Sequence, residues 1–343
     1  MPPPSDPPIL QVRNLAKHYE ARRGFGSAKA RIKAVDGVSF DLRRGETLGL
    51  VGESGCGKSS VARTILRLEE PTSGEVLFRG KDVATMTPAE FKQFRRKVQV
   101  VFQDPYAALN PRMTVEEIVS EPWMIHRGFL PRAQWAERVR DLLEGVGLRR
   151  EHAERYPHQF SGGQLQRIGI ARAMALDPEI LICDEPVSAL DLSVQAQVIN
   201  LLEDIQARSG IAYLFIAHDL SVVRHLSDRV AVMYLGRVAE IGPGEAVFET
   251  PVHPYSVALL SAEPDLDVRA AARPRIALKG EIPSPANPPS GCRFRNRCWR
   301  AQAVCASDVP ALQPQPAGAA RLAACHFPLA PQAGAAAAEA ALT

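Results

Sequence analysis

Long apolar runs are missing from this sequence of 343 residues. No stretch approaches the roughly 18 to 20 apolar residues of a membrane-spanning helix, so any membrane contact is expected to be made through a partner. The opening residues lack a basic segment followed by an apolar one, so we expect no secretory signal. A net charge of only +3 gives no general argument for nucleic-acid binding. These absences predict a protein of the cytoplasm.

Cysteine is scarce except near the end of the chain, where four of the six cysteines lie. A disulfide framework is not expected in the cytoplasm. The four are separated by five, six and nineteen residues, so the C-x-x-C spacing of a zinc ribbon is absent. Four clustered thiolates suit zinc or a [4Fe–4S] cluster, and the alternative is reduced thiols in an irregular segment. The four residues are Cys292, Cys298, Cys305 and Cys325.

Short apolar runs alternate with helical patterns through much of the chain. Such runs indicate strands that are buried on both faces of a sheet. The alternation predicts an α/β fold with a parallel sheet covered by helices on both sides. The predicted strands are 47–51, 98–102, 180–183 and 212–216, and the predicted helices are 59–68, 164–175 and 193–208.

Other segments depart from this alternation. A strand is expected at 9–19, followed by a basic loop at 20–33. Residues 103–161 have helical patterns without apolar strands, which predicts a helical subdomain. Beyond about residue 250 the composition shifts to proline, alanine and cysteine, and the alanine-rich stretch 328–343 is expected to be disordered or weakly helical.

The predicted strand 47–51 runs into a glycine-rich loop that matches G-x-x-x-x-G-K-[ST], with a predicted helix after it. Glycines let successive N–H groups point at phosphate oxygens, and the helix N-terminus adds its positive dipole end. Lys58 is expected to reach the β- and γ-phosphates, and Ser59 to bind Mg²⁺. The predicted nucleotide-binding residues are Gly52, Glu53, Ser54, Gly55, Cys56, Gly57, Lys58, Ser59 and Ser60.

Two acidic residues, Asp184 and Glu185, end the apolar strand at 180–183. Carboxylates at the end of a buried strand are costly unless they bind something. With a phosphate loop upstream, Asp184 is placed to hold Mg²⁺ and Glu185 to act as general base on the attacking water. The alternative, an acidic turn before Pro186, does not explain the loop.

The segment Ser161-Gly162-Gly163-Gln164 comes directly before a helical pattern. Ser161 and Gly163 are therefore expected near a helix N-terminus, where free N–H groups favour an anion. A simple N-cap role for Ser161 is the alternative, and the two roles are compatible.

The order of phosphate loop, Ser-Gly-Gly-Gln segment and strand ending in two carboxylates resembles the ATP-binding cassette, the motor of ABC transporters. The resemblance implies a P-loop NTPase (RecA-like) core with an antiparallel β subdomain and an α-helical subdomain. It implies that Tyr19 stacks on adenine, that Gln103 contacts Mg²⁺ or the lytic water, and that His218 contacts the γ-phosphate. The segment 161–164 would bind the γ-phosphate of ATP held by another subunit, and Asp191 would belong to a loop at that interface.

The chain departs from the commonest family pattern at two positions. Phe160 stands where leucine is commonest, and Val187 stands where many relatives have threonine. Neither departure removes a catalytic group.

Segments outside the core resemble the ATPases of oligopeptide/dipeptide (and nickel) importers. They are His253-Pro254-Tyr255, 280–285 and 288–292. The resemblance, with the basic insert before residue 34, implies an F-type subunit that pairs with a D-type ATPase. It also implies two transmembrane permease subunits, an indirect solute-binding protein, a peripheral place on the cytoplasmic face of the inner membrane, and a [4Fe–4S] cluster on the four cysteines.

The predicted organisation follows from these resemblances. An ABC ATPase domain covers 9–250, with its helical subdomain at about 104–163. A C-terminal importer extension covers 251–328, and 329–343 is a flexible tail.

Three functions are compatible with these motifs. The first is an ATP-hydrolysing subunit that powers solute import, with ATP and Mg²⁺ as cofactors. The second is a soluble ABC ATPase acting on nucleic acid or ribosomes, disfavoured because the chain has one cassette and no basic patch. The third is an inactive interaction protein, disfavoured by the intact Lys58, Asp184, Glu185 and His218. Peptide, dipeptide, nickel and other solutes all stay open as cargo.

Overall fold

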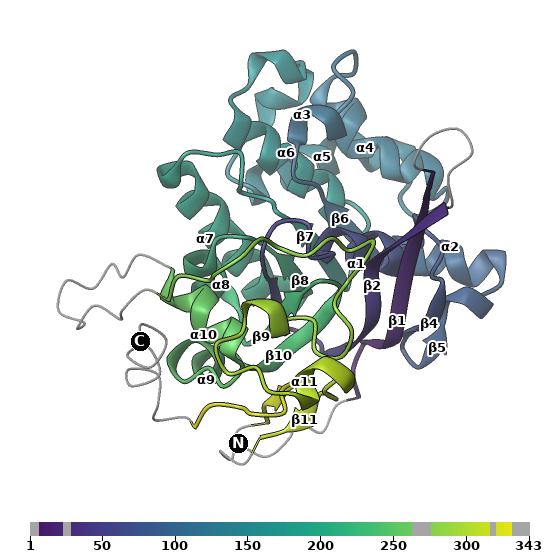
Figure 1. Ribbon diagram of the computed structural model, residues 1–343. Coiled ribbons are helices and arrows are strands. Elements are labelled where there is room, and N and C mark those ends of the chain that lie inside the picture. Colours follow the sequence, from purple (N-terminus) through teal and green to yellow (C-terminus); the bar gives the residue numbers. More distant parts are fainter. Residues whose placement is uncertain (1–6, 23–28, 263–275, 316–319, 331–343) are drawn as a thin grey trace. The chain divides into compact units, whose positions relative to one another are not determined.

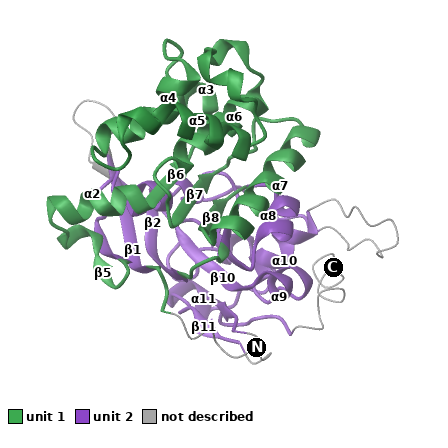
Figure 2. Ribbon diagram, turned by 180° about the vertical axis from the view of Figure 1, so that it is seen from behind, with its two compact units in different colours: residues 1–10, 42–47, 78–217 green, residues 11–41, 48–77, 218–343 purple. Residues whose placement is uncertain are grey.

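The computed structural model describes residues 7–22, 29–262, 276–315 and 320–330 (Figure 1). The chain forms two compact units, which Figure 2 shows in different colours. Unit 1 comprises 1–10, 42–47 and 78–217, and unit 2 comprises 11–41, 48–77 and 218–343. Across the described ranges, no helix is both long enough and apolar enough to cross a membrane.

Unit 1 contains three parallel strands in the order β6-β7-β8 and a set of helices. The strands are β6 (Val98–Val101), β7 (Ile180–Asp184) and β8 (Ala212–Ile216), and β8 is buried throughout, which explains its continuous apolar run. A short strand, β5 (Lys81–Asp82), precedes them. The helices are α2 (Pro88–Lys97), α3 (Pro105–Ala108), α4 (Val115–Ile125), α5 (Trp135–Gly145), α6 (Gly162–Met174) and α7 (Leu192–Ser209). The 3-10 turns are η1 (Val83–Thr85), η2 (Arg132–Gln134), η3 (Arg150–Glu154) and η4 (Pro157–Gln159).

The helical part of unit 1 is fixed by caps and by one buried tryptophan. Thr114 forms a capping box with Glu117 at the start of α4. Trp123 of α4 is buried, and its indole N–H donates to the carbonyl oxygen of Ala175, 2.8 Å away, just after α6. The helical character predicted for 103–161 is confirmed.

Unit 2 contains two sheet segments. In one, β3 (Thr47–Val51) runs parallel to β9 (Arg229–Tyr234), and β10 (Arg237–Pro243) pairs antiparallel with β9. β12 (Leu322–Ala323) then pairs with β10, and β11 (Gln313–Pro314) with β12, both antiparallel. In the other, the strands are neighbours in the order β2-β1-β4 and comprise β1 (Leu10–Arg22), β2 (Lys29–Leu42) and β4 (Ser73–Phe78). The helices are α1 (Lys58–Ile65), α8 (Leu220–Leu226), α9 (Gly244–Glu249), α10 (Pro254–Ser261) and α11 (Val304–Ser307), with the 3-10 turn η5 (Arg295–Arg297).

Two predicted irregular segments, the basic loop at 20–33 and the flexible tail at 329–343, lie partly outside the described residues. The basic loop predicted at 20–33 is too long, because β1 continues to Arg22 and β2 begins at Lys29. Residues 23–28 lie outside the described part of the chain, as do residues 331–343 of the predicted flexible tail.

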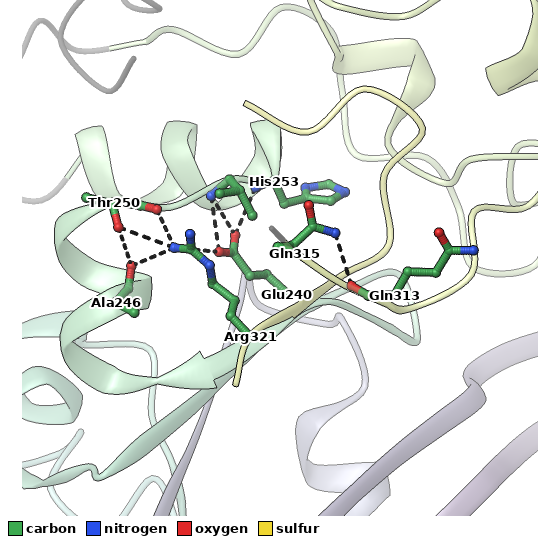
Figure 3. Close-up of polar contacts among 8 residues, drawn as sticks. Glu240, Ala246, Thr250, His253, Gln313, Gln315 and Arg321 are labelled. Carbon is green, nitrogen blue, oxygen red and sulfur yellow. Dashed lines mark hydrogen bonds and ion pairs between the residues drawn. The ribbon is translucent and has the colours of Figure 1, made fainter. Parts of the chain in front are cut away.

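A buried polar group joins the C-terminal residues of unit 2 to its sheet (Figure 3). Glu240 of β10 is fully buried, and its carboxylate accepts hydrogen bonds from the backbone N–H groups of Val252 and His253, at 3.1 and 2.9 Å. Arg321, just before β12, lies 3.9 Å from the carboxylate and donates to the carbonyl oxygen of Ala246 in α9. A buried charge needs such partners, so β10, α9 and β12 are tied together.

Candidate functional site

The glycine-rich loop of unit 2 joins β3 to α1, as its motif predicts. Lys58, the first residue of α1, is buried, and its ammonium donates to the carbonyl oxygens of Gly52 and Glu53 at 2.7 and 3.3 Å. The amine of Lys58 therefore lies against the backbone of its own loop.

Two glycines let this loop approach neighbouring backbone closely. A Cβ on Gly52 (φ +150°) would lie 2.2 Å from the carbonyl oxygen of Met233, and one on Gly57 (φ +110°) would lie 2.1 Å from that of Ala34. The loop also accepts a hydrogen bond from Gly236, whose N–H is 2.8 Å from the carbonyl oxygen of Cys56. The loop is thus packed against β2 and against the turn between β9 and β10.

Glu53 is held by two residues from the C-terminal part of unit 2. Its backbone N–H donates to the hydroxyl of Tyr255 in α10, at 2.9 Å. Its carboxylate accepts two hydrogen bonds from the guanidinium of Arg297 in η5, at 2.7 and 3.0 Å. These partners are 202 and 244 residues away in sequence, so no short-range pattern indicates them.

Tyr19 of β1 lies beside the end of the same loop. Its hydroxyl donates to the carboxylate of Glu69 and lies 3.3 Å from the hydroxyl oxygen of Ser60. Burial and the hydrogen bond to Glu69 raise the pKa of the Tyr19 hydroxyl. His218 also belongs to unit 2, directly before Asp219, which caps α8.

Unit 1 carries the predicted carboxylates at the ends of its parallel strands. Asp184 is the last residue of β7, and Glu185 follows with a φ of +51°, in the left-handed region. A non-glycine residue in this region is strained by about 1–3 kcal/mol, and such residues gather at functional sites. Because β6 pairs with β7 in parallel, Gln103, two residues beyond β6, lies at the same sheet edge as Asp184.

The segment 161–164 and Asp191 also meet in unit 1. The hydroxyl of Ser161 accepts from the N–H of Gln164, and the Gln164 side chain accepts from the N–H of Ser161 at 3.0 Å. This capping box confirms the N-cap role predicted for Ser161. Asp191 caps α7 by accepting from the N–H of Val194 at 3.0 Å, and a Cβ on Gly163 would lie 2.2 Å from the Val194 side chain. The N-termini of α6 and α7 therefore pack closely together.

The cysteines of the C-terminal region are free thiols, and the N–H of Cys292 donates to the carbonyl oxygen of Cys305 at 2.9 Å. Burial raises the pKa of Cys298 to about 11 and that of Cys325 to about 12, which keeps both thiols protonated at neutral pH. Within the described ranges, no group of three or more histidine, cysteine, aspartate or glutamate residues is arranged to hold a metal ion. The described residues therefore give no support for the metal or iron–sulfur site predicted at these cysteines.

The predicted site residues therefore fall into two sets, one in each unit. Unit 2 brings together Tyr19 and the loop 52–60, and it also contains His218. Unit 1 carries Gln103, Ser161, Gly162, Gly163, Gln164, Asp184, Glu185 and Asp191.

Comparison with known proteins identifies two families that match different parts of the chain. Residues 35–188 match the ABC transporter family model, and residues 239–305 match that of the oligopeptide/dipeptide transporter C-terminal region. The chain is 51% identical over 322 residues to the oligopeptide transport ATP-binding protein AppF of Bacillus subtilis, covering 93% of this chain and 97% of AppF.

Two solved structures share the fold. The ATP-binding cassette MJ0796, in a dimeric post-hydrolysis state bound to ADP and Pi, is 30% identical with a TM-score of 0.61 and covers 68% of this chain and 98% of its own. The protein cbiO1 of Clostridium perfringens, part of the ABC transporter complex cbiONQ, is 27% identical with a TM-score of 0.60 and covers 71% of this chain and 91% of its own. These matches show that the chain belongs to the ABC transporter family of ATPases and carries the C-terminal region of the oligopeptide/dipeptide transporters.

Proposed function

We propose that this chain is the ATP-hydrolysing subunit of an ABC importer of peptides. The observation that carries the proposal is that one chain matches both the ABC transporter family model and the model of the oligopeptide/dipeptide transporter C-terminal region. The relative AppF, which is named for oligopeptide transport, supports peptides as the cargo class. The ATPase domain is assigned to 9–250, with the helical subdomain at about 104–163, and the importer extension to 251–328.

Each motif residue has a proposed role in hydrolysis. Lys58 leaves the carbonyl oxygens of its loop and binds the β- and γ-phosphates, while Ser59 and Asp184 bind the Mg²⁺ that accompanies ATP. Glu185 accepts a proton from the attacking water as general base. Gln103 contacts Mg²⁺ or that water, and His218 contacts the γ-phosphate. Tyr19 stacks on adenine.

The proposed partners follow from the two sets of residues. The segment 161–164, with Asp191, binds ATP held by a second ABC ATPase subunit, here of the D type. Two permease subunits form the membrane path, and a solute-binding protein acts on them without touching this chain. The chain would lie peripherally on the cytoplasmic face of the inner membrane.

Exposed apolar side chains in unit 1 support the permease contact. The exposed apolar side chains are Phe102, Tyr106, Met124 and Ile125, of which Tyr106 and Ile125 are each 62% exposed. Phe102 and Ile125 line the same pocket. Large apolar side chains left exposed to water are candidates for a partner contact.

Co-purification with the permease subunits tests the proposal. We expect the wild-type chain to co-purify and its ATPase rate to rise when membranes containing the permeases are supplied with peptide. The double substitution Tyr106→Glu and Ile125→Glu should abolish co-purification while ATP binding by the chain alone is kept. Leu68→Glu, a substitution of another exposed leucine (57% exposed) in unit 2, is the matched control and should co-purify. Stimulation of the ATPase by DNA or ribosomes instead would contradict the proposal.

A [4Fe–4S] cluster on the four C-terminal cysteines is not part of the proposal, because nothing among the described residues supports one. Iron and acid-labile sulfide, measured on anaerobically purified protein, test this exclusion. Four irons per chain with broad visible absorption would overturn it.

A further inference from the structure

The phosphate loop of unit 2 is contacted at Glu53 by two side chains of the C-terminal region, Tyr255 and Arg297. We propose that these are positioning residues, which set the backbone direction and the charge of the loop and so make ATP affinity depend on the C-terminal region. The inference rests on ATP binding by the ABC family and does not depend on the cargo.

Tyr255 fixes the backbone at Glu53. The Glu53 N–H donates to the Tyr255 hydroxyl at 2.9 Å, so this amide is directed toward α10. The Tyr255 ring is fully buried against Tyr234 and Phe294, with ring centroids 4.6 and 5.4 Å away. Because the packed ring fixes the position of the Tyr255 hydroxyl, it also fixes the direction in which the Glu53 N–H must point to donate to it. The peptide between Gly52 and Glu53 is therefore held in one orientation.

Arg297 balances the charge of Glu53. A carboxylate beside a loop that binds phosphate repels the nucleotide unless a cation compensates it. The Arg297 side chain is only 8% exposed and makes two hydrogen bonds to the carboxylate, the geometry that guanidinium groups favour. The hydrogen bonds to Glu53 also raise the pKa of Arg297, so its charge is permanent.

The position of Arg297 depends on the cysteine-bearing segment. Arg297 ends η5, and the next residue is Cys298. Its guanidinium lies 5.8 Å from the ring centroid of Tyr234, and the Tyr234 and Phe294 ring centroids are 5.3 Å apart. The conformation of residues 292–298 therefore determines whether Arg297 can form its ion pair with Glu53 of the loop.

The test measures binding of the fluorescent analogue mant-ATP with Mg²⁺ to the full-length chain. Arg297→Ala leaves the Glu53 carboxylate uncompensated, so we expect the Kd to rise roughly tenfold. Adding Glu53→Gln removes the uncompensated charge, so the double variant should return to within about threefold of wild type. Arg297→Lys keeps the charge without the two-bond geometry and should fall between wild type and Arg297→Ala.

Arg295→Ala is the matched control. Arg295 lies on the same turn, but its guanidinium donates to Ser290 and to the carbonyl oxygen of Ala306, not to the loop. Its Kd should stay within about twofold of wild type. Thermal unfolding without nucleotide, run on every variant, separates a change in affinity from a loss of folded protein.

In the assembled transporter, Arg297→Ala should raise the KM for ATP more than it lowers kcat, because the uncompensated Glu53 carboxylate weakens ATP binding while the general base is untouched. A wild-type Kd for Arg297→Ala would overturn the proposal, as would a double variant as weak as the single one. If Arg297→Ala does not fold, Tyr255→Phe takes its place, because it removes the acceptor of the Glu53 N–H. A wild-type Kd for Tyr255→Phe would also overturn the proposal. The mant-ATP affinities are measured on the chain alone. A failure of the chain to bind permeases would therefore contradict the importer proposal without changing the outcome of this test.

Discussion

At the scale of single residues, this site is built from backbone conformations that most side chains cannot adopt. Gly52 and Gly57 bring the loop against the carbonyl oxygens of neighbouring strands, and Glu185 is held at a positive φ. The sequence motif identifies the glycines, but the reason each is required differs. Gly57 needs both its φ and the absence of a Cβ, whereas Gly55 (φ +77°) has no atom within 4 Å of the place where a Cβ would lie.

This difference predicts unequal effects of two alanine substitutions. Gly55→Ala should destabilise the nucleotide-free chain by about 1–2 kcal/mol, the strain of a left-handed residue. Gly57→Ala adds a clash with the carbonyl oxygen of Ala34, 2.1 Å from the new Cβ, so it should lose at least about 2 kcal/mol more. Urea-induced unfolding of both variants measures this. Equal midpoints for the two would show that the close approach to β2 does not constrain the loop.

At the scale of elements, the start of α10 links the buried polar group of unit 2 to the loop. His253 caps this helix by accepting the N–H of Tyr255 on its Nδ1 at 3.0 Å. Burial lowers the pKa of His253 to about 4, so the imidazole is neutral and Nδ1 stays free to accept. Protonation would remove the cap of the helix that carries Tyr255.

Stability should therefore depend on pH through His253. The unfolded histidine titrates near pH 6.5 and the folded one near 4, so the unfolded chain binds the extra proton between these values. The stabilisation is complete above about pH 6.5 and is lost as the pH falls toward 4, by up to about 1.4 kcal/mol per pH unit. His253→Asn keeps a capping acceptor but does not titrate.

Urea unfolding at pH 7.5 and 5.0 compares the two proteins. The wild type should lose about 2 kcal/mol more than His253→Asn between these values. The neighbouring carboxyl of Glu240, whose pKa is raised by burial, titrates with the opposite sign, but it is present in both proteins. Equal losses would contradict a neutral buried imidazole.

The elements themselves were predictable where the signal is local. The apolar runs at 47–51, 180–183 and 212–216 are β3, β7 and β8, because a strand buried on both faces has an uninterrupted apolar sequence. β12 has two residues and exists only through its pairing with β10, so nothing local indicates it. In the same way, the loop motif predicts Lys58 and Ser59, but the partners of Glu53 come from the distant C-terminal region.

At the scale of the whole molecule, the nucleotide motifs are divided between two units, each assembled from separate stretches of sequence. The loop 52–60 belongs to unit 2, while the segment 161–164 belongs to unit 1. If the segment binds ATP held by another subunit, damage to it should leave the chain's own ATP binding intact and prevent association with the partner ATPase.

Gly162→Arg tests this division. Gly162 has no positive φ, and a Cβ there would meet only the Leu190 side chain at an ordinary 3.5 Å, so the substitution is compatible with the fold. The long side chain of an arginine at this position would keep the partner's ATP away from the backbone N–H groups at the N-terminus of α6. In a Glu185→Gln background, which is expected to bind ATP without turnover, ATP-dependent association with the partner ATPase should weaken about a hundredfold. Mant-ATP binding by the chain alone should be unchanged.

The control places the same side chain elsewhere in unit 1. Gly145, at the end of α5, has no atom within 4 Å of the place where a Cβ would lie, so Gly145→Arg enters open space. Light scattering with and without ATP should show association for Gly145→Arg and none for Gly162→Arg. If Gly162→Arg associates like the control, the segment 161–164 acts only as the cap of α6, and the ATP between subunits is bound by other residues. If Gly162→Arg instead loses its own mant-ATP binding, the segment serves the ATP of its own chain, because the same substitution then removes both events.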